Sequence, residues 1–294
     1  MAKNNDFAIF ILSNGRPDRV YTYSSLIKSG YTGQVYLIID NEDKSSQEYY
    51  RIYGDKVIVF DKAAIADTFD EGDNFGDRRT VVYARNACFK IANELGITYF
   101  MQLDDDYVDF RYKMDSRYNS IHKKDILNLD NIIGSLLDYY KSIPAKSLAI
   151  AQGGDFIGGL DGDMDRSMNK RRKCMNTFLC STERPFQFIG RINEDVNTYT
   201  RLQNTGFLFL TFPLIAIQQK QTQSNSGGMT ELYLDSGTYL KSFYTVMYSP
   251  SSVDIRMMGP VKPRLHHKIK WANTVPCIID EKHKKHRVVE TVTI

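Results

Sequence analysis

The sequence lacks long apolar runs and has few cysteines, and both shortages narrow the class of protein. No stretch approaches the roughly 18 consecutive apolar residues of a membrane span, so we expect no membrane partner. The first apolar run, Phe7 to Leu12, is short, and only one lysine precedes it. We therefore interpret it as a strand and not as a signal peptide. The 4 cysteines form no CxxC pair, which indicates neither a zinc site nor a disulfide framework and favours a reducing cytoplasm.

What the sequence does contain is an alternation of apolar runs and amphipathic stretches over its first hundred residues. The apolar runs predict strands over Phe7–Leu12, Val35–Ile39, Val57–Phe60 and Tyr99–Leu103. Turn and breaker residues between them predict a loop at Asp61–Asp77 and helices over Arg19–Lys28, Gln47–Tyr53 and Arg78–Leu95. This order predicts an α/β fold with a Rossmann-type, mostly parallel sheet and helices on both faces. The second half is less regular, with a helix expected over Leu129–Tyr140 and strands over Leu148–Gln152 and Phe207–Ile217.

Three adjacent carboxylates, Asp104, Asp105 and Asp106, follow the fourth predicted strand. In open α/β sheets, ligands bind at the carboxyl ends of the strands. Adjacent acids repel one another, and a divalent magnesium or manganese ion relieves this repulsion because it prefers carboxylate oxygens and substrate phosphates. We therefore predict a metal–diphosphate site here. The alternative is a polar turn that simply ends a strand.

Two other strand ends and one helix carry side chains that suit a bound nucleotide. Asn14 and Arg16 follow the first strand and Asp40 follows the second. A loop in such a place can hold a base, and a carboxylate can bond ribose hydroxyls. Arg85, in the helix before the three acids, can match diphosphate oxygens with two hydrogen bonds. Each also has a plainer interpretation, as a turn residue or as an arginine on a helix surface.

Two further groups lie in the second half of the chain. Asn193-Glu194-Asp195 contains a carboxylate pair, in which crowding and burial can raise one pKa and so produce a general base. The same run is also an ordinary helix N-cap. His266 and His267 are adjacent, and in an extended segment adjacent side chains face opposite ways. Only one of the two histidines could then complete a metal shell.

A basic cluster follows the middle of the chain, at Lys170, Arg171, Arg172 and Lys173. Such a density of cations suits contacts with a phosphate backbone, whose strength falls with salt. A solvated loop is the alternative. Together with the polar stretch 218–228 and the basic tail 282–287, the cluster favours a polyanionic acceptor.

Taken in order, these motifs resemble those of the GT-A glycosyltransferases, which bind a nucleotide-diphosphate sugar through a metal held by a DxD motif. More narrowly, the sequence resembles the TET-associated glycosyltransferases in Tyr31–Val35, Val57–Lys62, Asn193–Tyr199 and Gly227–Thr230. These enzymes occur largely in phages and are thought to add sugar to hydroxymethylated pyrimidines in DNA. The resemblance implies a GT-A-like sheet and a glycosyltransferase whose donor we expect to be UDP-glucose and whose acceptor we expect to be hydroxymethylcytosine or hydroxymethyluracil.

The resemblance also implies a role for each candidate residue. Asp195 would be the catalytic base, supported by Glu194. Asp106 would hold the manganese or magnesium ion together with His267, or with its neighbour His266. The remaining candidates would bind the nucleotide sugar: Asn14, Arg16, Asp40, Arg85, Asp104 and Asp105. The basic residues Lys170 to Lys173 would bind DNA.

The expected organisation is one domain with two halves. Residues 1–110 would bind the nucleotide sugar, and residues 111–294 would form an irregular acceptor and catalytic half. We expect inversion at the sugar and a cytoplasmic location, which is the host cytoplasm if a phage encodes the protein. Two alternatives remain open: a GT-A transferase that acts on a glycan or protein, and a non-catalytic DNA-binding module on the same fold.

Overall fold

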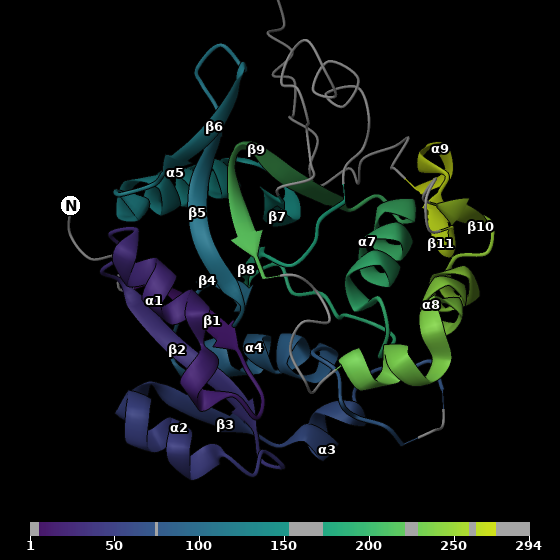
Figure 1. Cartoon of the computed structure of the whole chain (residues 1–294), viewed down its shortest axis with the longest axis horizontal. Coiled ribbons are helices and arrows are strands. Elements are labelled where there is room, and N and C mark those ends of the chain that lie inside the picture. The colour runs from purple at the N-terminus through teal and green to yellow at the C-terminus, as the bar shows by residue number, and fades with distance from the viewer. Residues whose placement is uncertain (1–5, 74–75, 153–172, 221–228, 259–262, 275–294) are drawn as a thin grey trace, which may run out of the picture.

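The computed structural model describes residues 6–73, 76–152, 173–220, 229–258 and 263–274, and one large sheet organises them. Its nine strands lie in the order β3-β2-β1-β4-β8-β7-β9-β5-β6 (Figure 1). Their bounds are β1 (Phe7–Leu12), β2 (Gln34–Asp40), β3 (Val57–Phe60), β4 (Tyr99–Asp104), β5 (Tyr107–Met114), β6 (Ser120–Asp125), β7 (Ala145–Gln152), β8 (Phe178–Ser181) and β9 (Leu208–Gln219). Only β5 and β8 run against the other seven strands of this sheet, so the expected mostly parallel α/β sheet is confirmed.

Helices cover both faces of the sheet, also as expected. Their bounds are α1 (Tyr21–Lys28), α2 (Ser46–Tyr53), α3 (Lys62–Ala66), α4 (Val82–Glu94), α5 (Leu129–Ser142), α7 (Glu194–Asn204), α8 (Met229–Tyr248) and α9 (Trp271–Thr274). Alternate residues of β1 divide between two apolar cores. Ile9 and Ile11 pack with α1, α2 and α5, whereas Phe10 packs with α4 and α7. Because β1 is buried on both sides, its sequence is a continuous apolar run without alternation.

The differences from the sequence predictions in the first half are local. The helix expected from Arg19 begins at Tyr21, because Pro17–Arg19 form a 3-10 turn ahead of it. The helix expected from Arg78 begins at Val82. The stretch expected to be a loop after β3 contains the short helix α3, whose first turn is capped by the Asp61 side chain, which accepts from Ala64 N at 3.0 Å.

The second half contains elements that the sequence analysis did not predict. The hairpin of β5 and β6 starts directly after the three acids and forms one edge of the sheet. A separate antiparallel pair, β10 (Val253–Met258) and β11 (Arg264–Ile269), lies beside α8 and α9 (Figure 1). Among the described residues, no helix is both long and apolar enough to cross a membrane.

Candidate active site

The three acids form a tight turn between β4 and β5, hereafter the DDD turn. Helix α1 holds this turn through Thr22. The Thr22 hydroxyl donates to the carbonyl oxygen of Asp104 at 2.5 Å and accepts from Tyr107 N at 3.0 Å, and Thr22 N donates to the carbonyl oxygen of Asp105 at 3.2 Å. The backbone of the turn is therefore fixed, and its three carboxylates are directed to three different environments.

The middle acid, Asp105, points inward and is 2% exposed. One carboxylate oxygen accepts from Ser13 Oγ at 2.6 Å and the other from Arg16 Nη2 at 2.7 Å. Ser13 Oγ also lies 2.7 Å from the Tyr49 hydroxyl, which accepts from Arg16 N at 3.0 Å. Burial raises the pKa of Asp105, and the two donors oppose that shift. Its contacts make Asp105 the link between the DDD turn and the loop after β1.

Asp106 is held by a neutral side chain. Gln219, the last residue of β9, donates from Nε2 to Asp106 Oδ2 at 2.9 Å. Asp106 Oδ1 is buried and has no hydrogen-bond partner in the part of the chain that the structure describes. Burial, followed by the charge of Asp104, raises the pKa of Asp106 to about 6. A buried carboxylate oxygen without a donor is costly unless a ligand meets it.

Arg85 joins the DDD turn to α7. Its side chain is 2% exposed and lies 4.9 Å over the ring of Phe178. Nη2 lies 2.9 Å from Asp104 Oδ1, and Nε lies 2.9 Å from Glu194 Oε1. In the structure, the guanidinium of Arg85 lies between two carboxylates, and its expected contact with a diphosphate stays a prediction. These two residues are 90 positions apart in the chain, and Arg85 brings their segments together.

The carboxylate pair lies in the first turn of α7, where Asp195 is buried and the Glu194 side chain is 12% exposed. Burial raises the pKa of Glu194 to about 7; the charge of Asp195 adds to this shift and Arg85 opposes it. Burial also raises the pKa of Asp195, whose Oδ1 accepts from Val196 N at 2.7 Å. A carboxyl group whose pKa lies closer to neutrality is a better proton acceptor, so the site suits general-base chemistry.

Asn193 occupies the N-cap position but does not cap the helix. Its backbone is left-handed, with φ 54°, and its side chain makes no cap hydrogen bond. Nδ2 instead donates to the carbonyl oxygen of Lys241 at 2.7 Å and lies 3.5 Å from Nδ1 of His267. The interpretation of this run as an ordinary Asn N-cap is therefore wrong, because the amide is used to join α7 to α8 and β11.

The two histidines lie on β11, which is extended as the sequence analysis supposed. Their rings nevertheless stack, with centroids 4.3 Å apart, so the expectation that they face opposite ways is wrong. His267 packs inward against Asn193, and His266 lies over it. Burial, reinforced by nearby cations, lowers the pKa of His266 to about 4 and that of His267 to about 3. Both rings are therefore neutral, which is the form that metal ions bind.

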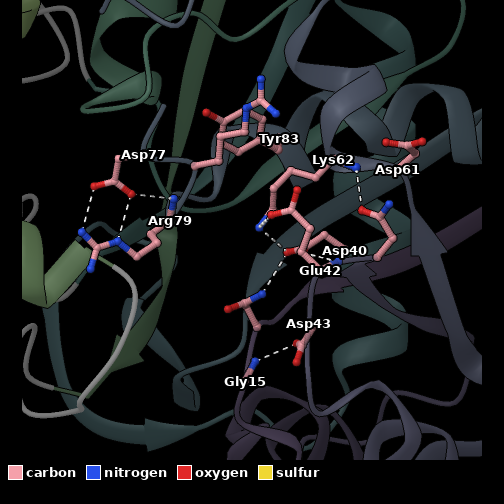
Figure 2. A network of polar contacts seen from close by, with 12 residues as sticks. Gly15, Asp40, Glu42, Asp43, Asp61, Lys62, Asp77, Arg79 and Tyr83 are labelled. Atoms are coloured by element: carbon pink, nitrogen blue, oxygen red, sulfur yellow. Dashed lines mark hydrogen bonds and ion pairs between the residues drawn. The ribbon is translucent and has the colours of Figure 1, made fainter. Parts of the chain in front are cut away.

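A second polar network lies at the ends of β1, β2 and β3 (Figure 2). Asp40 accepts from Asn14 Nδ2 at 2.9 Å, and its Oδ2 lies 3.0 Å from Lys62 Nζ. Lys62 also lies 3.4 Å from Glu42, and its side chain is only 10% exposed. Lys62 was not predicted as a site residue, although its place two residues after the end of β3 puts it on the same sheet edge as Asp40.

Arg191 is another residue that the sequence analysis missed. It is 2% exposed, and its Nη2 lies 2.8 Å from Asp73 Oδ2. Its backbone N donates to the carbonyl oxygen of Glu71 at 2.8 Å, and Gly190 N donates to that of Asp70 at 2.8 Å. The acidic loop before α4 is thus fastened to the segment that leads into α7. A lone arginine beside a glycine gave no signal of this contact in the sequence.

The predicted residues therefore form two described groups. Asn14 and Asp40 meet at the ends of β1 and β2, and Asp104 reaches Glu194 through Arg85. Among the described residues, no cluster of three or more His, Cys, Asp or Glu side chains is arranged to hold a metal ion. Of the predicted DNA-binding residues, Lys173 is exposed, and Lys170, Arg171 and Arg172 lie outside the described residues.

Comparison with known proteins gives a family and several distant structural likenesses. Glucosyl-3-phosphoglycerate synthase from Mycobacterium tuberculosis, in complex with Mg²⁺ and UDP, is 10% identical, with a TM-score of 0.43 over 90% of this chain and 88% of that chain. The same protein with Mn²⁺, UDP-glucose and phosphoglyceric acid gives 10% identity and a TM-score of 0.43, over 89% of this chain and 86% of that chain.

A cytidylyltransferase from Leptospira borgpetersenii is 12% identical, with a TM-score of 0.37 over 84% of this chain and 95% of that chain. No curated protein sequence matches the chain. The model of one family, described as TET-Associated Glycosyltransferase, matches residues 7–228, which include the DDD turn, Arg85 and the Glu194-Asp195 pair. This chain therefore belongs to the TET-associated glycosyltransferase family.

Proposed function

We propose that this glycosyltransferase moves glucose from UDP-glucose to a hydroxymethylated pyrimidine base in DNA, with a divalent metal ion bound beside the diphosphate. The observation that carries the proposal is the buried bridge through Arg85, which joins Asp104 of the DDD turn to Glu194 beside the candidate base. A transferase needs its donor site and its base on one rigid frame, because the reacting atoms must be held in close alignment.

The network around Asp40 supports a uridine donor. Uracil presents an N–H donor beside carbonyl acceptors. Asp40 offers an acceptor, and Asn14 and Lys62 offer donors within 3.0 Å of the same carboxylate. In the proposed organisation, residues 1–110 supply most of the donor site, and residues 111–294 supply the acceptor side and Asp195.

The residues of the DDD turn fit a divalent metal ion. Asp106 has a buried oxygen without a hydrogen-bond partner among the described residues, and Asp104 is its neighbour in the turn. Magnesium and manganese are commonly held by one or two carboxylates, with substrate phosphates completing the shell, so a preformed cluster of three side chains is not required. We assign Asp106 as a ligand and keep His267, whose imidazole is neutral, as a candidate second one. A bound ion would neutralise charge on the diphosphate as it departs.

The proposed reaction is a displacement with one carboxylate base. The hydroxymethyl oxygen of the acceptor attacks the anomeric carbon of glucose, and its proton passes to Asp195. The bond between that carbon and the β-phosphate oxygen breaks, and its electron pair leaves with UDP. Burial raises the pKa of Asp195 and so its proton affinity, and Arg85 fixes Glu194 beside it. Attack opposite the leaving group inverts the sugar.

A DNA acceptor is supported by the family and by charge. The exposed Lys173 ends the basic cluster that was identified in the sequence. Its charge also reaches Asp195, where it opposes the rise in the pKa of that carboxyl group. A hydroxymethyl group inside a duplex is hard to reach, so we propose that the base is flipped out or single-stranded. The proposed location is the cytoplasm, where DNA and nucleotide sugars are both present.

The experiment that tests the proposed function is a panel of transfer reactions. The protein is incubated with manganese, several radiolabelled sugar nucleotides, and DNA that contains either hydroxymethylated or unmodified pyrimidines. We expect label in the hydroxymethylated DNA alone, and most of it from UDP-glucose. Label that appears in a glycan or protein acceptor, and in neither DNA, would instead support a transferase with a different substrate.

A further inference from the structure

The three acids of the DDD turn differ in what neutralises them. Arg85 pairs with Asp104, and Arg16 pairs with Asp105. Within the part of the chain that the structure describes, Asp106 makes no ion pair, and its one side-chain hydrogen bond comes from the neutral amide of Gln219. Among the described residues, no cation therefore compensates the carboxylate of Asp106, while one of its oxygens is held in place.

Gln219 is placed by the sheet itself. It is the last residue of β9 and lies opposite Tyr107 of β5 in the antiparallel register. The next residue, Lys220, donates its backbone N–H to the carbonyl oxygen of Asp106 at 3.2 Å. Backbone contacts thus hold the end of β9 against the DDD turn, so the amide of Gln219 reaches the carboxylate from a rigid strand.

The orientation of the Gln219 amide is fixed by a second residue. Asn176 donates from Nδ2 to Gln219 Oε1 at 3.0 Å, which leaves Nε2 of Gln219 facing Asp106. Rotating the amide by half a turn would set two donors against each other and two acceptors against each other. Asn176 has a left-handed backbone, with φ 61°, and its carbonyl oxygen accepts from the Tyr107 hydroxyl at 2.8 Å. These contacts close a ring through Asp106, Tyr107, Asn176 and Gln219.

We propose that Gln219 is a positioning residue that occupies Oδ2 of Asp106 and thereby presents Oδ1 to the divalent metal ion. This inference rests on the proposed function, because it needs a metal at Asp106. Oδ1 is buried and has no hydrogen-bond partner among the described residues, which is what we expect of an oxygen that binds a metal ion. Outer partners of this kind orient ligands, and their loss commonly weakens metal binding by about 10-fold to 100-fold.

The test is a titration of Mn²⁺ in the presence of UDP, monitored by calorimetry and by electron paramagnetic resonance. Gln219→Met keeps the length of the side chain and removes the donor. We expect Mn²⁺ to bind at least about tenfold more weakly, with a changed resonance line shape, while UDP without metal binds as in the wild type. Gln218→Met is the matched control, because Gln218 is the adjacent, exposed residue of the same strand, and it should bind Mn²⁺ like the wild type.

A second variant tests the ring independently of how well Gln219→Met folds. Asn176→Gly keeps the left-handed backbone and removes the amide that fixes Gln219, so Mn²⁺ should bind several-fold more weakly. The double variant should bind no more weakly than Gln219→Met alone, because Asn176 acts through Gln219. Wild-type affinity for Mn²⁺ in Gln219→Met, or additive losses in the double variant, would overturn the inference while the proposed function stands. A wild-type protein that binds UDP without any dependence on metal would overturn the metal assignment and this inference with it.

Discussion

Replacing Arg85 with methionine tests whether the buried bridge between the DDD turn and α7 holds the site together. The side chain of Arg85 is 2% exposed, and each of its carboxylate contacts is 2.9 Å long. Methionine fills similar space without charge, so Asp104 and Glu194 lose their common partner. Removing one member of a buried ion pair costs about 3 to 5 kcal/mol. We expect a loss of unfolding free energy in this range at pH 8.

The loss should depend on pH in a direction that the structure fixes. The pKa of Glu194 in the folded protein is raised to about 7 from an ordinary 4.5. The folded state therefore binds this proton more tightly than the unfolded chain does, and the stability gained from it is full below about pH 4.5 and is lost as the pH rises through 7. Without Arg85 the pKa of Glu194 rises further. The variant should be close to the wild type at pH 6 and should fall behind it between pH 7 and pH 9.

Urea unfolding at pH 6, 7, 8 and 9 measures this effect. The single tryptophan, Trp271, is a suitable fluorescent probe because its ring stacks on Tyr199 of α7, with centroids 6.0 Å apart. Arg51→Met is the control, because Arg51 pairs with Glu48 on the surface and its loss should change little. A loss for Arg85→Met that stays the same across this pH range, or one below about 1 kcal/mol, would refute the bridge as a structural link.

Three other variants test separate predictions about the protein. Asp106→Asn should fold normally but lose the metal-supported part of UDP binding, which calorimetry with and without manganese measures. If Asp106 holds no metal, the variant and the wild type will bind UDP with equal affinity in the presence of manganese. Asp195→Asn should keep donor binding and lower turnover by about 100-fold or more, because the proton acceptor is gone; normal turnover would mean that Asp195 only caps α7. Neutralising Arg171, Arg172 and Lys173 together should flatten the slope of log DNA affinity against log salt by about 0.7 to 0.9 for each phosphate that the protein no longer neutralises, with UDP binding unchanged. An unchanged slope would leave the cluster as a solvated loop.

The first half of the fold could be predicted from the sequence because its strands are continuous apolar runs. In β1 this run reflects burial on both faces, and β1 and β3 were predicted with the bounds that the structure has. The hairpin after the DDD turn was not predicted. Its first strand, β5, has the sequence YVDFRYKM, in which charged residues interrupt the apolar positions, and β6 is an edge strand. The strand β8, with the sequence FLCS, ends in a serine and lacks the uninterrupted apolar run of the equally short β3.

The sequence predicts where the candidate site lies, but it could not predict the contacts within that site. A run of three acids after a buried strand is a local signal. The different environments of these acids depend on hydrogen-bond partners far along the chain. Asp105 accepts from Ser13, 92 positions away, and Asp106 accepts from Gln219, 113 positions away. No local pattern distinguishes the three carboxylates. The roles proposed for Asn14, Asp40, Glu194, Asp195 and the metal ligands stay predictions until the experiments are done.

The proposed function is tested most directly by the mass of one modified oligonucleotide. A synthetic strand with a single hydroxymethylcytosine is incubated with the protein, UDP-glucose and manganese, and a matched strand carries methylcytosine at the same position. We predict that the first strand gains the mass of one glucose residue and the second gains none, and that Asp195→Asn forms the glucosylated strand far more slowly than the wild type. An unchanged mass of the hydroxymethylated strand under conditions where the protein binds UDP and manganese would contradict the assignment of DNA as the acceptor.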